Sequence, residues 1–400
     1  MNVLLVSQYF LPESGATQNR LAAFAHGLVE RGHRVTVVCE QPNHPAGIFH
    51  PGYGKRPIAT ERAHAMTIHR LWVATSPRKT TARRLAFYGS FALGAAATVL
   101  SRRTHDVCFA SSPPLPGVLA VADASRMRRT PLVVDVRDIW PAAAQALGEL
   151  SNRRVISALE RAERRLYRQA RRVTATTRPF CRHIDCVAGT PKSVHLPNGA
   201  LDDLVAWPDT DPPPRDEFVV GYAGNLGIAQ GLQIALDAAQ RLRGRAVRFA
   251  LVGDGAVSAE LRAGVAQRGL SDVVSVGPAI PVADVGSFLR DCDALLVPLR
   301  DHPLLEDFIP SKLYDAMAVG RPVLVAARGE AAALTTECGA GIVVDPEDGA
   351  GLAAAVERLV GDRRLAQQLG RAGRRSAADL TRSKQVDVLE RVLCEAASRP

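Results

Sequence analysis

Short apolar runs alternate with helical stretches along the whole chain. In the first half, apolar runs at residues 3–6, 35–38, 107–110, 132–136 and 173–175 are each followed by a turn or a stretch of helical periodicity. In the second half the alternation restarts, with runs at 218–223, 247–252, 274–276, 294–298, 323–325 and 341–344. Strands that alternate with helices are typical of parallel sheets covered by helices. The pattern predicts an α/β protein with two Rossmann-like, doubly wound domains that face each other across a cleft.

A proline-rich segment separates the two series of strands. Residues 207–217, WPDTDPPPRDE, hold four prolines among acidic side chains, a composition typical of a semi-rigid linker. We therefore expect an N-terminal domain at 1–203, a linker at 204–217 and a C-terminal domain at 218–385. Residues 386–400 are expected to form a C-terminal helix or tail that can cross back to the first domain.

The stretch 306–325, EDFIPSKLYDAMAVGRPVLV, predicts a loop, a helix and a strand. Pro310 suits the first turn of a helix, and Gly320 is placed to end that helix. The free N–H groups of a helix N-terminus, with Lys312 in the first turn, would bind a diphosphate. Asp315 lies one turn along the same face, within reach of ligand hydroxyl groups. An ordinary helix with a solvated first turn would show the same pattern.

Three features of the first half lie where parallel strands are expected to end. Gly15 follows the first run and allows either a close approach to a phosphate or a tight turn. The loop 41–53, QPNHPAGIFHPGY, is too rich in proline and glycine for regular structure, and its His44 is either an acceptor contact or an ordinary loop residue. Arg137 and Asp138 follow the fourth run, where they would point into the cleft or form a structural ion pair.

The composition is that of a globular chain with an uneven distribution of charge. Hydrophobic residues make up 47% and charged residues 22%. Residues 1–200 hold 28 Lys or Arg against 12 Asp or Glu, a balance of +16, whereas residues 201–400 hold 22 against 28, a balance of −6. The basic half has reason to meet an anionic surface. Aromatic residues are only 5% and no nucleic-acid-binding motif is present, which favours acidic lipid or anionic small molecules over nucleic acid.

Residues 85–100, LAFYGSFALGAAATVL, are an uncharged stretch with two arginines on each side. This length is short for a bilayer span, so an interfacial helix with basic ends and a buried helix of the domain both fit. The N-terminus lacks the basic region of a signal peptide, and the seven cysteines are scattered without a C-x-x-C pair. We expect reduced thiols in a cytoplasmic protein, with peripheral attachment to the inner face of the plasma membrane as a further option.

Several motifs together resemble the retaining nucleotide-sugar glycosyltransferases of family 4, which have the GT-B fold. They are YFLPESGATQNRLAAFAHGLVERGHRVTVV, PNHPAGIFHPGY, VRDIWP, LPNGA, YAGNLGIAQGL, LVGDG and IPSKLYDAMAVGRPVLVA, and they span nearly the whole chain. PNHPAGIFHPGY and VRDIWP look most like the bacterial subgroup that adds hexosamine-type sugars to surface-polysaccharide precursors. The resemblance implies a hexosyltransferase of class EC 2.4.

The resemblance also implies roles for individual residues. In the family, an E-x7-E pair faces the donor sugar and binds the nucleotide ribose; the matching positions are Asp307 and Asp315, with Glu306 one place out of register. Basic residues that often hold the diphosphate are replaced by the neutral Asn225 and Gln230. The implied catalytic residues are Asp138, Asp307 and Lys312; the implied donor-binding residues are Gly15, Gly224, Asn225, Gly227, Gln230, Gly253, Lys312, Leu313 and Asp315; and the implied acceptor residues are His44, Arg137 and Asp138.

The implied reaction moves a sugar from a nucleotide-diphosphate sugar, expected to be UDP-linked, to a hydroxyl of a lipid-linked or polysaccharide precursor such as a polyprenyl-diphosphate-linked sugar. Front-face attack, in which the departing diphosphate takes the acceptor proton, needs only positioning and charge stabilisation. No metal or other cofactor is expected, because the D-x-D motifs lie in the linker at 209–211 and at a helix end at 291–293. The alternatives are a nucleotide-sugar 2-epimerase on the same fold and a non-catalytic, membrane-associated partner protein.

Overall fold

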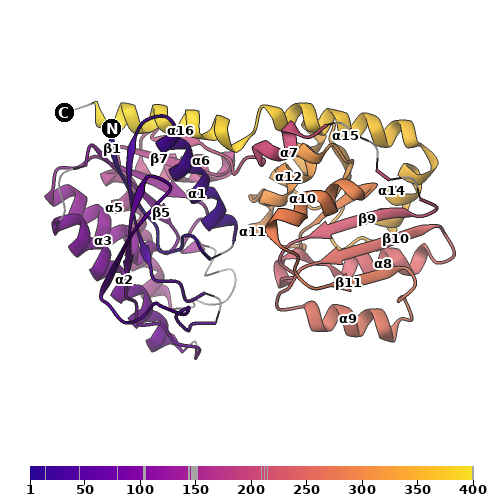
Figure 1. Ribbon diagram of the computed structural model, residues 1–400, viewed down its shortest axis with the longest axis horizontal. Helices are drawn as coiled ribbons and strands as arrows, with labels where there is room; N and C mark the ends of the chain where they lie inside the picture. Colours follow the sequence, from indigo (N-terminus) through magenta and orange to yellow (C-terminus); the bar gives the residue numbers. More distant parts are fainter. Residues whose placement is uncertain are drawn as a thin grey trace. The chain divides into compact units, whose positions relative to one another are not determined.

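The computed structural model describes residues 1–13, 15–44, 46–78, 80–101, 105–142, 145, 152–208, 210, 212–213 and 215–398. The chain forms two compact units, one of Met1–Pro197 with Arg382–Pro400 and one of Asn198–Thr381. Each unit is built on its own largely parallel sheet, with helices between successive strands (Figure 1). The predicted α/β class is confirmed.

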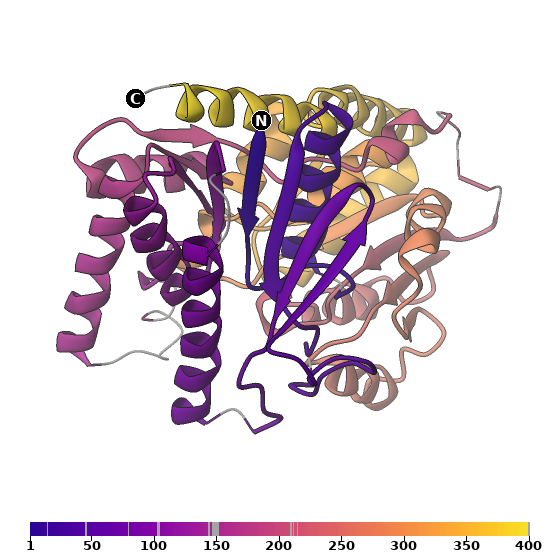
Figure 2. The same ribbon diagram turned by 60° about the vertical axis from the view of Figure 1, so that its left-hand side comes forward.

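The sheet of the first unit is parallel except at one edge. Its strands are β1 (Asn2–Val6), β2 (Arg34–Glu40), β3 (Ile58–Ala63), β4 (Met66–Leu71), β5 (Val107–Ser112), β6 (Leu132–Val136), β7 (Arg172–Ala175) and β8 (Ser193–His195). They lie in the order β3-β4-β2-β1-β5-β6-β7-β8, and only β3 runs antiparallel to its neighbour. The hairpin of β3 and β4 is seen clearly in Figure 2. It was not predicted, because β3 (IATERA) carries no continuous apolar run.

The helices of the first unit include one from the end of the chain. They are α1 (Ala16–Glu30), α2 (Thr81–Ser101), α3 (Leu115–Met127), α5 (Arg153–Gln169), α6 (Arg178–Ala188) and α16 (Arg382–Ala397). Helix α16 packs on α1, where a Cβ on Gly27 would lie 2.7 Å from the Val386 side chain. Leu389 and Leu393 of α16 are buried in the core of this unit. The tail thus lies in the first unit, and it starts four residues before the expected boundary at 386.

Helix α2 contains the uncharged stretch of the sequence. One of its faces is buried through Phe91, Ala95 and Val99, and it packs against α3. The opposite side exposes Leu85 to 68% and Leu93 to 76%. The helix is therefore partly core and partly an apolar surface, so neither of the two interpretations of the sequence describes it alone.

The second unit has a six-stranded, fully parallel sheet. Its strands are β9 (Phe218–Ala223), β10 (Val247–Val252), β11 (Val274–Gly277), β12 (Ala294–Pro298), β13 (Val323–Ala326) and β14 (Gly341–Val344). Its helices are α7 (Asp202–Ala206), η1 (Ile228–Gln230), α8 (Gln233–Arg241), α9 (Ser258–Gln267), α10 (Val282–Asp291), α11 (Pro303–Glu306), α12 (Ser311–Val319), α13 (Glu330–Glu337), α14 (Gly349–Gly361) and α15 (Arg363–Ala378). The order β11-β10-β9-β12-β13-β14 is the strand order of a Rossmann fold.

The proline-rich segment packs against the second unit. A Cβ on Gly286 would lie 2.6 Å from the Trp207 ring, and the Arg290 guanidinium lies over that ring at 4.9 Å. The Thr210 carbonyl accepts a hydrogen bond of 2.8 Å from Arg321. The boundary between the units falls at 197/198, before the expected linker at 204–217, because these contacts tie the segment to the second unit.

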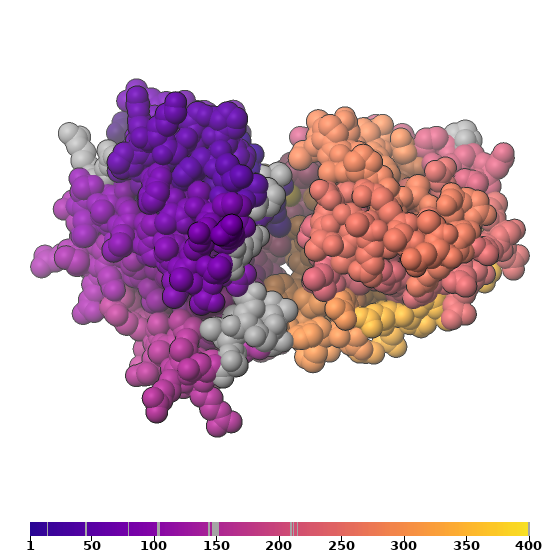
Figure 3. Space-filling view, turned by 90° about the horizontal axis from the view of Figure 1, so that it is seen from below, coloured from indigo at the N-terminus to yellow at the C-terminus, as the bar shows by residue number. Residues whose placement is uncertain are grey.

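Both sheets change direction of winding at a central strand pair. In the first unit the pair is β1 and β5, and in the second it is β9 and β12. In open parallel sheets, ligands bind beyond the carboxyl ends of the strands at such a point. Figure 3 shows the first unit from below, where the early, indigo-to-purple part of the chain forms much of the surface. The predicted site residues lie after β1, β2 and β6 in the first unit and after β9, β10 and β12 in the second.

Candidate active site

Lys312 lies in the first turn of α12, as the sequence predicts. The helix runs over Ser311–Val319, with Pro310 at its N-cap and Gly320 in the left-handed conformation at its C-cap (φ 82°). The free N–H groups of this helix end, together with the ammonium group of Lys312, make a local positive field. Burial lowers the pKa of Lys312 to about 7, although part of the residue's surface remains in solvent.

The Lys312 ammonium group is held by an aromatic residue from the first strand of its unit. Its Nζ lies 3.9 Å from the centroid of the Tyr222 ring and donates a hydrogen bond to the Tyr222 hydroxyl. That hydroxyl in turn donates to the Asn225 carbonyl at 2.6 Å. Tyr222 is only 1% exposed, so the ring is a fixed support. Tyr222 was not predicted from the sequence, because no local signal pairs two residues 90 positions apart.

Glycines bring the ends of β9 and β10 into close backbone contact near Lys312. A Cβ on Gly253 would lie 1.8 Å from the Gly224 carbonyl oxygen, and one on Gly224 would lie 3.3 Å from Lys312 Nζ. The turn after β9 is equally tight, since a Cβ on Gly227 would lie 2.6 Å from Asn225 Nδ2. Open backbone beside an ammonium group is suited to a phosphate.

Gln230 ends the turn after β9, at the last position of η1. A Cβ on Gly227 would lie 2.7 Å from Gln230 Oε1, so the amide side chain folds back over the turn. Among the described residues, Gln230 Oε1 is buried without a hydrogen-bond partner. Gly224, Asn225, Gly227, Gln230, Gly253 and Lys312 are thus brought together.

Asp307 and Asp315, the acidic pair of the second unit, have different surroundings. Asp307 is exposed and lies at the C-cap of α11, and Glu306 beside it is exposed as well. Asp315 points to α7, where its carboxylate accepts a hydrogen bond of 3.0 Å from the Leu201 N–H. The Leu313 side chain is fully buried in the core and its N–H donates to the Pro310 carbonyl at 2.9 Å. Leu313 therefore anchors the helix and does not present a ligand-binding surface.

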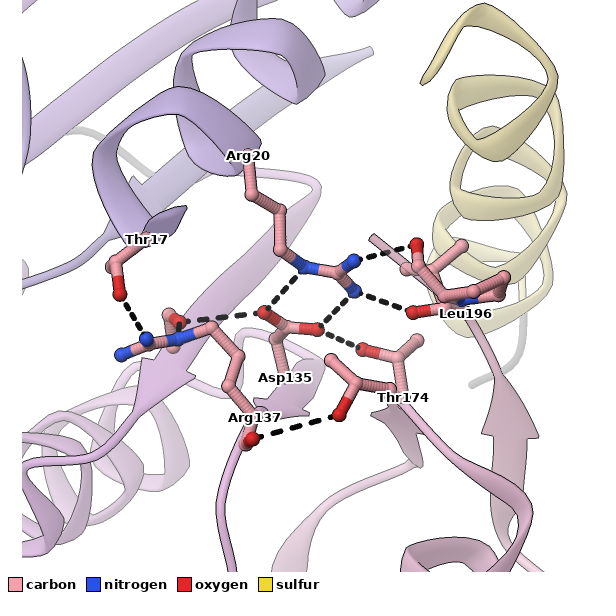
Figure 4. A network of polar contacts seen from close by, with 9 residues as sticks. Thr17, Arg20, Asp135, Arg137, Thr174 and Leu196 are labelled. Carbon is pink, nitrogen blue, oxygen red and sulfur yellow. Dashed lines mark hydrogen bonds and ion pairs between the residues drawn. The ribbon is translucent and has the colours of Figure 1, made fainter. Parts of the chain in front are cut away.

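In the first unit, Arg137 links the ends of three elements (Figure 4). Its guanidinium donates to Ser111 Oγ at 2.9 Å and to Thr17 Oγ1 in the first turn of α1. It also donates to the Pro113 carbonyl at 2.8 Å. Burial lowers the pKa of Arg137 to about 10, so the group stays charged at neutral pH. Through Thr17, Arg137 positions the start of α1. Thr17 lies two residues after Gly15, the N-cap of this helix.

Asp138 follows Arg137 at the end of β6. No ion pair joins the two side chains in the described part of the chain, so the structural pair considered from the sequence is not formed. Burial raises the pKa of Asp138, and the nearby charge of Arg137 opposes the shift. A partly buried carboxyl group with a raised pKa can position a hydroxyl group or take its proton.

A buried ion pair between α1 and β6, close to Arg137 and Asp138, was not predicted from the sequence. Arg20 of α1 and Asp135 of β6 lie 3.0 Å apart and are 2% and 0% exposed. Arg20 also donates to the carbonyls of Leu196 and Pro197, each at 2.7 Å, and Thr174 Oγ1 donates to Asp135 at 2.8 Å. Figure 4 shows Arg20 at the centre of this network. The network fixes α1 to strands β6 and β7 and to the segment after β8.

His44 lies on the loop after β2, and the Glu13 side chain holds this loop in place. Glu13 Oε1 accepts hydrogen bonds of 2.8 Å from the N–H groups of both Asn43 and His44. The His44 ring is exposed and lies edge-on to the Tyr9 ring, with centroids 6.0 Å apart. Arg137 is among the charges that act on Tyr9, so the two side chains lie near each other.

The described residues hold neither a candidate metal cluster nor a candidate membrane span. In the residues that the structure describes, no group of three or more His, Cys, Asp or Glu side chains is placed to hold a metal ion. Over the same residues, no helix combines the length and apolar character needed to cross a membrane.

Two Rossmann-type units, with a lysine and a helix N-terminus at the strand ends of the second, define the GT-B class of glycosyltransferases. Two family models match the chain, "Glycosyl transferase 4-like domain" over residues 15–199 and "Glycosyl transferases group 1" over residues 206–376. The chain therefore belongs to the family-4-like glycosyltransferases of the GT-B fold, as the resemblance implied.

Relatives and solved structures agree with this assignment. The chain is 25% identical over 381 residues to the "Putative colanic acid biosynthesis glycosyl transferase WcaI" of Escherichia coli K12, covering 90% of this chain and 92% of the relative. The Anabaena protein Alr3699/HepE in complex with UDP matches with a TM-score of 0.73 at 18% identity, over 99% of this chain and all of that one. Its complex with UDP-glucose matches with a TM-score of 0.70 at 17% identity, over 99% of this chain and all of that one.

Proposed function

We propose that this glycosyltransferase uses a UDP-linked hexose derivative and transfers the sugar, with retention of anomeric configuration, to a hydroxyl of a lipid-linked saccharide precursor. The observation that carries the proposal is the Lys312 ammonium group, held on the Tyr222 ring beside the open backbone of Gly224. The UDP and UDP-glucose complexes of a protein with the same fold support a nucleotide-sugar donor. The similarity to a putative colanic acid enzyme supports a polysaccharide precursor as acceptor.

The reaction follows from where charge develops. The acceptor oxygen attacks the anomeric carbon as the bond to the β-phosphate oxygen breaks, and the electron pair of that bond passes to the diphosphate. The departing diphosphate takes the acceptor proton. Lys312 and the N–H groups at the start of α12 face the growing negative charge, so they stabilise the transition state more than the bound donor. Asp138, with its raised pKa, would orient the acceptor hydroxyl in the first unit.

The remaining donor contacts are proposed on the same basis. Gly15, Gly227 and Gly253 are proposed to approach the phosphate oxygens through their backbone N–H groups, and Asn225 and Gln230 are proposed to supply neutral amides. Asp307 is proposed to meet the donor sugar from its exposed position after α11. Asp315 would bind the ribose by exchanging the hydrogen bond that it accepts from the Leu201 N–H for one from the ligand.

Donor binding and turnover test the proposal in sequence. Calorimetry with UDP-glucose should detect binding, and Lys312→Ala should raise the dissociation constant by about tenfold or more, since a charge-assisted hydrogen bond contributes about 1.5–3 kcal/mol. Lys55→Ala, a change of an exposed lysine in the first unit, is the matched control. An unchanged constant for Lys312→Ala would remove this residue from the site.

Turnover separates the proposal from its alternatives. UDP release that depends on a lipid extract, with a product whose new bond keeps the donor's anomeric configuration by NMR, is the expected result. Interconversion of UDP-sugars without any acceptor would indicate the 2-epimerase. Binding of UDP-sugars without turnover over a broad range of acceptors would favour the non-catalytic partner protein.

A further inference from the structure

We propose that a pocket in the first unit, formed by Tyr9, His44, Arg78, Arg83, Phe87 and Tyr88, binds the diphosphate-bearing end of a prenyl-linked saccharide acceptor. We call it the arginine–tyrosine pocket. The inference rests on the proposed function, because it names the place and the chemistry of acceptor binding in that reaction.

The arginine–tyrosine pocket is built where the first sheet ends. Tyr9 follows β1, His44 follows β2, Arg78 belongs to the segment after β4, and Arg83 lies in the first turn of α2. The cavity has a volume of about 190 Å³. A single water needs only about 10–15 Å³ of such space, so the cavity is large enough for a ligand group. Its position at the carboxyl ends of parallel strands is the usual place for a ligand in this fold.

The walls of the pocket are held by the protein's own hydrogen bonds. Thr75 Oγ1 donates to Asn43 Oδ1 at 2.8 Å, which joins the segment after β4 to the loop after β2. Asn43 Nδ2 donates to Glu40 at 2.8 Å, and Glu13 accepts the N–H groups of Asn43 and His44. Asn43, Glu13 and Glu40 are all buried. A ligand therefore meets a preformed loop and loses little affinity to ordering it.

The charged side chains that line the pocket are Arg78, Arg83 and Arg84. Within the described residues, no carboxylate pairs with Arg78 or Arg83, and none lines the cavity. Other arginines of the same unit do have carboxylate partners, namely Arg31 with Asp387, Arg70 with Glu61, Arg165 with Asp123 and Arg172 with Glu395. The Arg83 guanidinium donates to Ser76 Oγ, and both residues line the pocket. Planar guanidinium groups bind phosphate oxygens in pairs.

Aromatic side chains complete the pocket. The Phe87 and Tyr88 rings lie 5.4 Å apart on the second turn of α2, and the Tyr9 ring stands edge-on to His44. Such rings offer an apolar face to the carbon-bound hydrogens of a sugar or to the first isoprene unit, and the Tyr hydroxyls offer hydrogen bonds. Tyr9 also lies near Arg137, so the pocket adjoins the strand end that carries Asp138.

The apolar surface of α2 favours a lipid-linked ligand over a free sugar phosphate. Leu85, Leu93 and Leu100 are 68%, 76% and 37% exposed and recur on one side of the helix that supplies Arg83. Helical spacing places this side opposite Arg83, Phe87 and Tyr88, so a prenyl chain would have to pass round the helix from the pocket to reach it. The guanidinium groups and the leucines thus match the two parts of a prenyl diphosphate.

Calorimetry on the full chain tests the proposal with geranyl diphosphate, inorganic diphosphate and UDP-glucose as probes. Arg78→Gln with Arg83→Gln is expected to weaken geranyl diphosphate binding by at least about tenfold, through the loss of charge-assisted hydrogen bonds. UDP-glucose binding and the thermal unfolding midpoint are expected to stay unchanged. Arg62→Gln is the matched control, because Arg62 is exposed on β3 and does not line the pocket.

Each of the other outcomes contradicts one part of the proposal. Unchanged geranyl diphosphate binding in the double variant removes the pocket as the diphosphate site. Inorganic diphosphate that binds as tightly as geranyl diphosphate identifies a site for free phosphate, which contradicts a lipid-linked acceptor. A variant that loses only its binding to phosphatidylglycerol vesicles identifies a headgroup contact and overturns the acceptor site. Failure of UDP-glucose to bind the unaltered protein would instead refute the donor half of the proposed function.

Discussion

Lys312 titrates near neutral pH, and this makes donor affinity a sensitive test of its role. Burial lowers the pKa of the free side chain to about 7. A bound diphosphate stabilises the charged form and raises that pKa, so Lys312 takes up a proton as the donor binds at pH 7 and above. Affinity is therefore greatest below pH 7 and falls as the pH rises.

The size of the effect follows from the fraction of Lys312 that is charged before the donor binds. With a pKa of about 7, that fraction falls from about nine-tenths at pH 6 to about one-tenth at pH 8. The dissociation constant for UDP-glucose is expected to rise about tenfold over this interval. UDP-glucose is preferred to UDP as the probe, because a terminal phosphate has its own pKa near 6.

Calorimetry at pH 6, 7 and 8 in buffers of different ionisation enthalpy measures both the affinity and the proton uptake. Lys312→Met should bind weakly at every pH, with no proton uptake assignable to this residue. An unaltered protein whose affinity is constant from pH 6 to 8 would refute the reasoning. If Lys312→Met kept the full pH dependence, a group other than Lys312 would be responsible.

The same lowered pKa has the opposite effect on folding. The unfolded chain holds a proton on this lysine up to about pH 10, whereas the folded protein loses it near pH 7. Between these values the unfolded state binds more protons, so the contribution of Lys312 to stability improves as the pH rises. Donor affinity and the stability of the second unit are thus expected to change in opposite directions above pH 7.

Three further predictions address the fold and the cofactor. Arg20→Met should lower the free energy of unfolding by about 3–5 kcal/mol in urea titrations, because Asp135 is left as an unpaired buried charge. The control Arg31→Met, at an exposed ion pair, should lower it by less than about 1 kcal/mol. Equal losses in the two variants would contradict a special role of the buried pair. Gly253→Ala should weaken UDP-glucose binding and lower the melting temperature, because its Cβ would lie 1.8 Å from a backbone oxygen; Gly361→Ala, with open space around it, should do neither. Activity should persist after dialysis against EDTA, since front-face transfer as proposed uses Lys312 and backbone N–H groups, and a loss restored by Mg²⁺ would contradict it.

The amino-acid sequence by itself determined the fold class and most of its strands. Parallel strands that are buried on both faces consist of continuous apolar runs in the sequence. The predicted runs at 218–223 and 294–298 therefore match β9 and β12 residue for residue. The helix at Lys312 was predicted in full, because proline and glycine mark its ends through local backbone preferences. Such signals act within a few residues and need no tertiary structure.

The tertiary structure alone decided which residues meet. Tyr222 supports Lys312 across 90 positions, Arg20 pairs with Asp135 across 115, and Leu201 occupies one oxygen of Asp315 across 114. It also assigned the proline-rich segment and α16 to their units through contacts of Trp207 and Val386. A carboxylate or an arginine has the same local sequence pattern whether it faces a ligand or a neighbouring strand. Only the burial and partners that folding imposes distinguish the structural ion pair at Asp135 from the candidate acid at Asp138, three residues later on the same strand end.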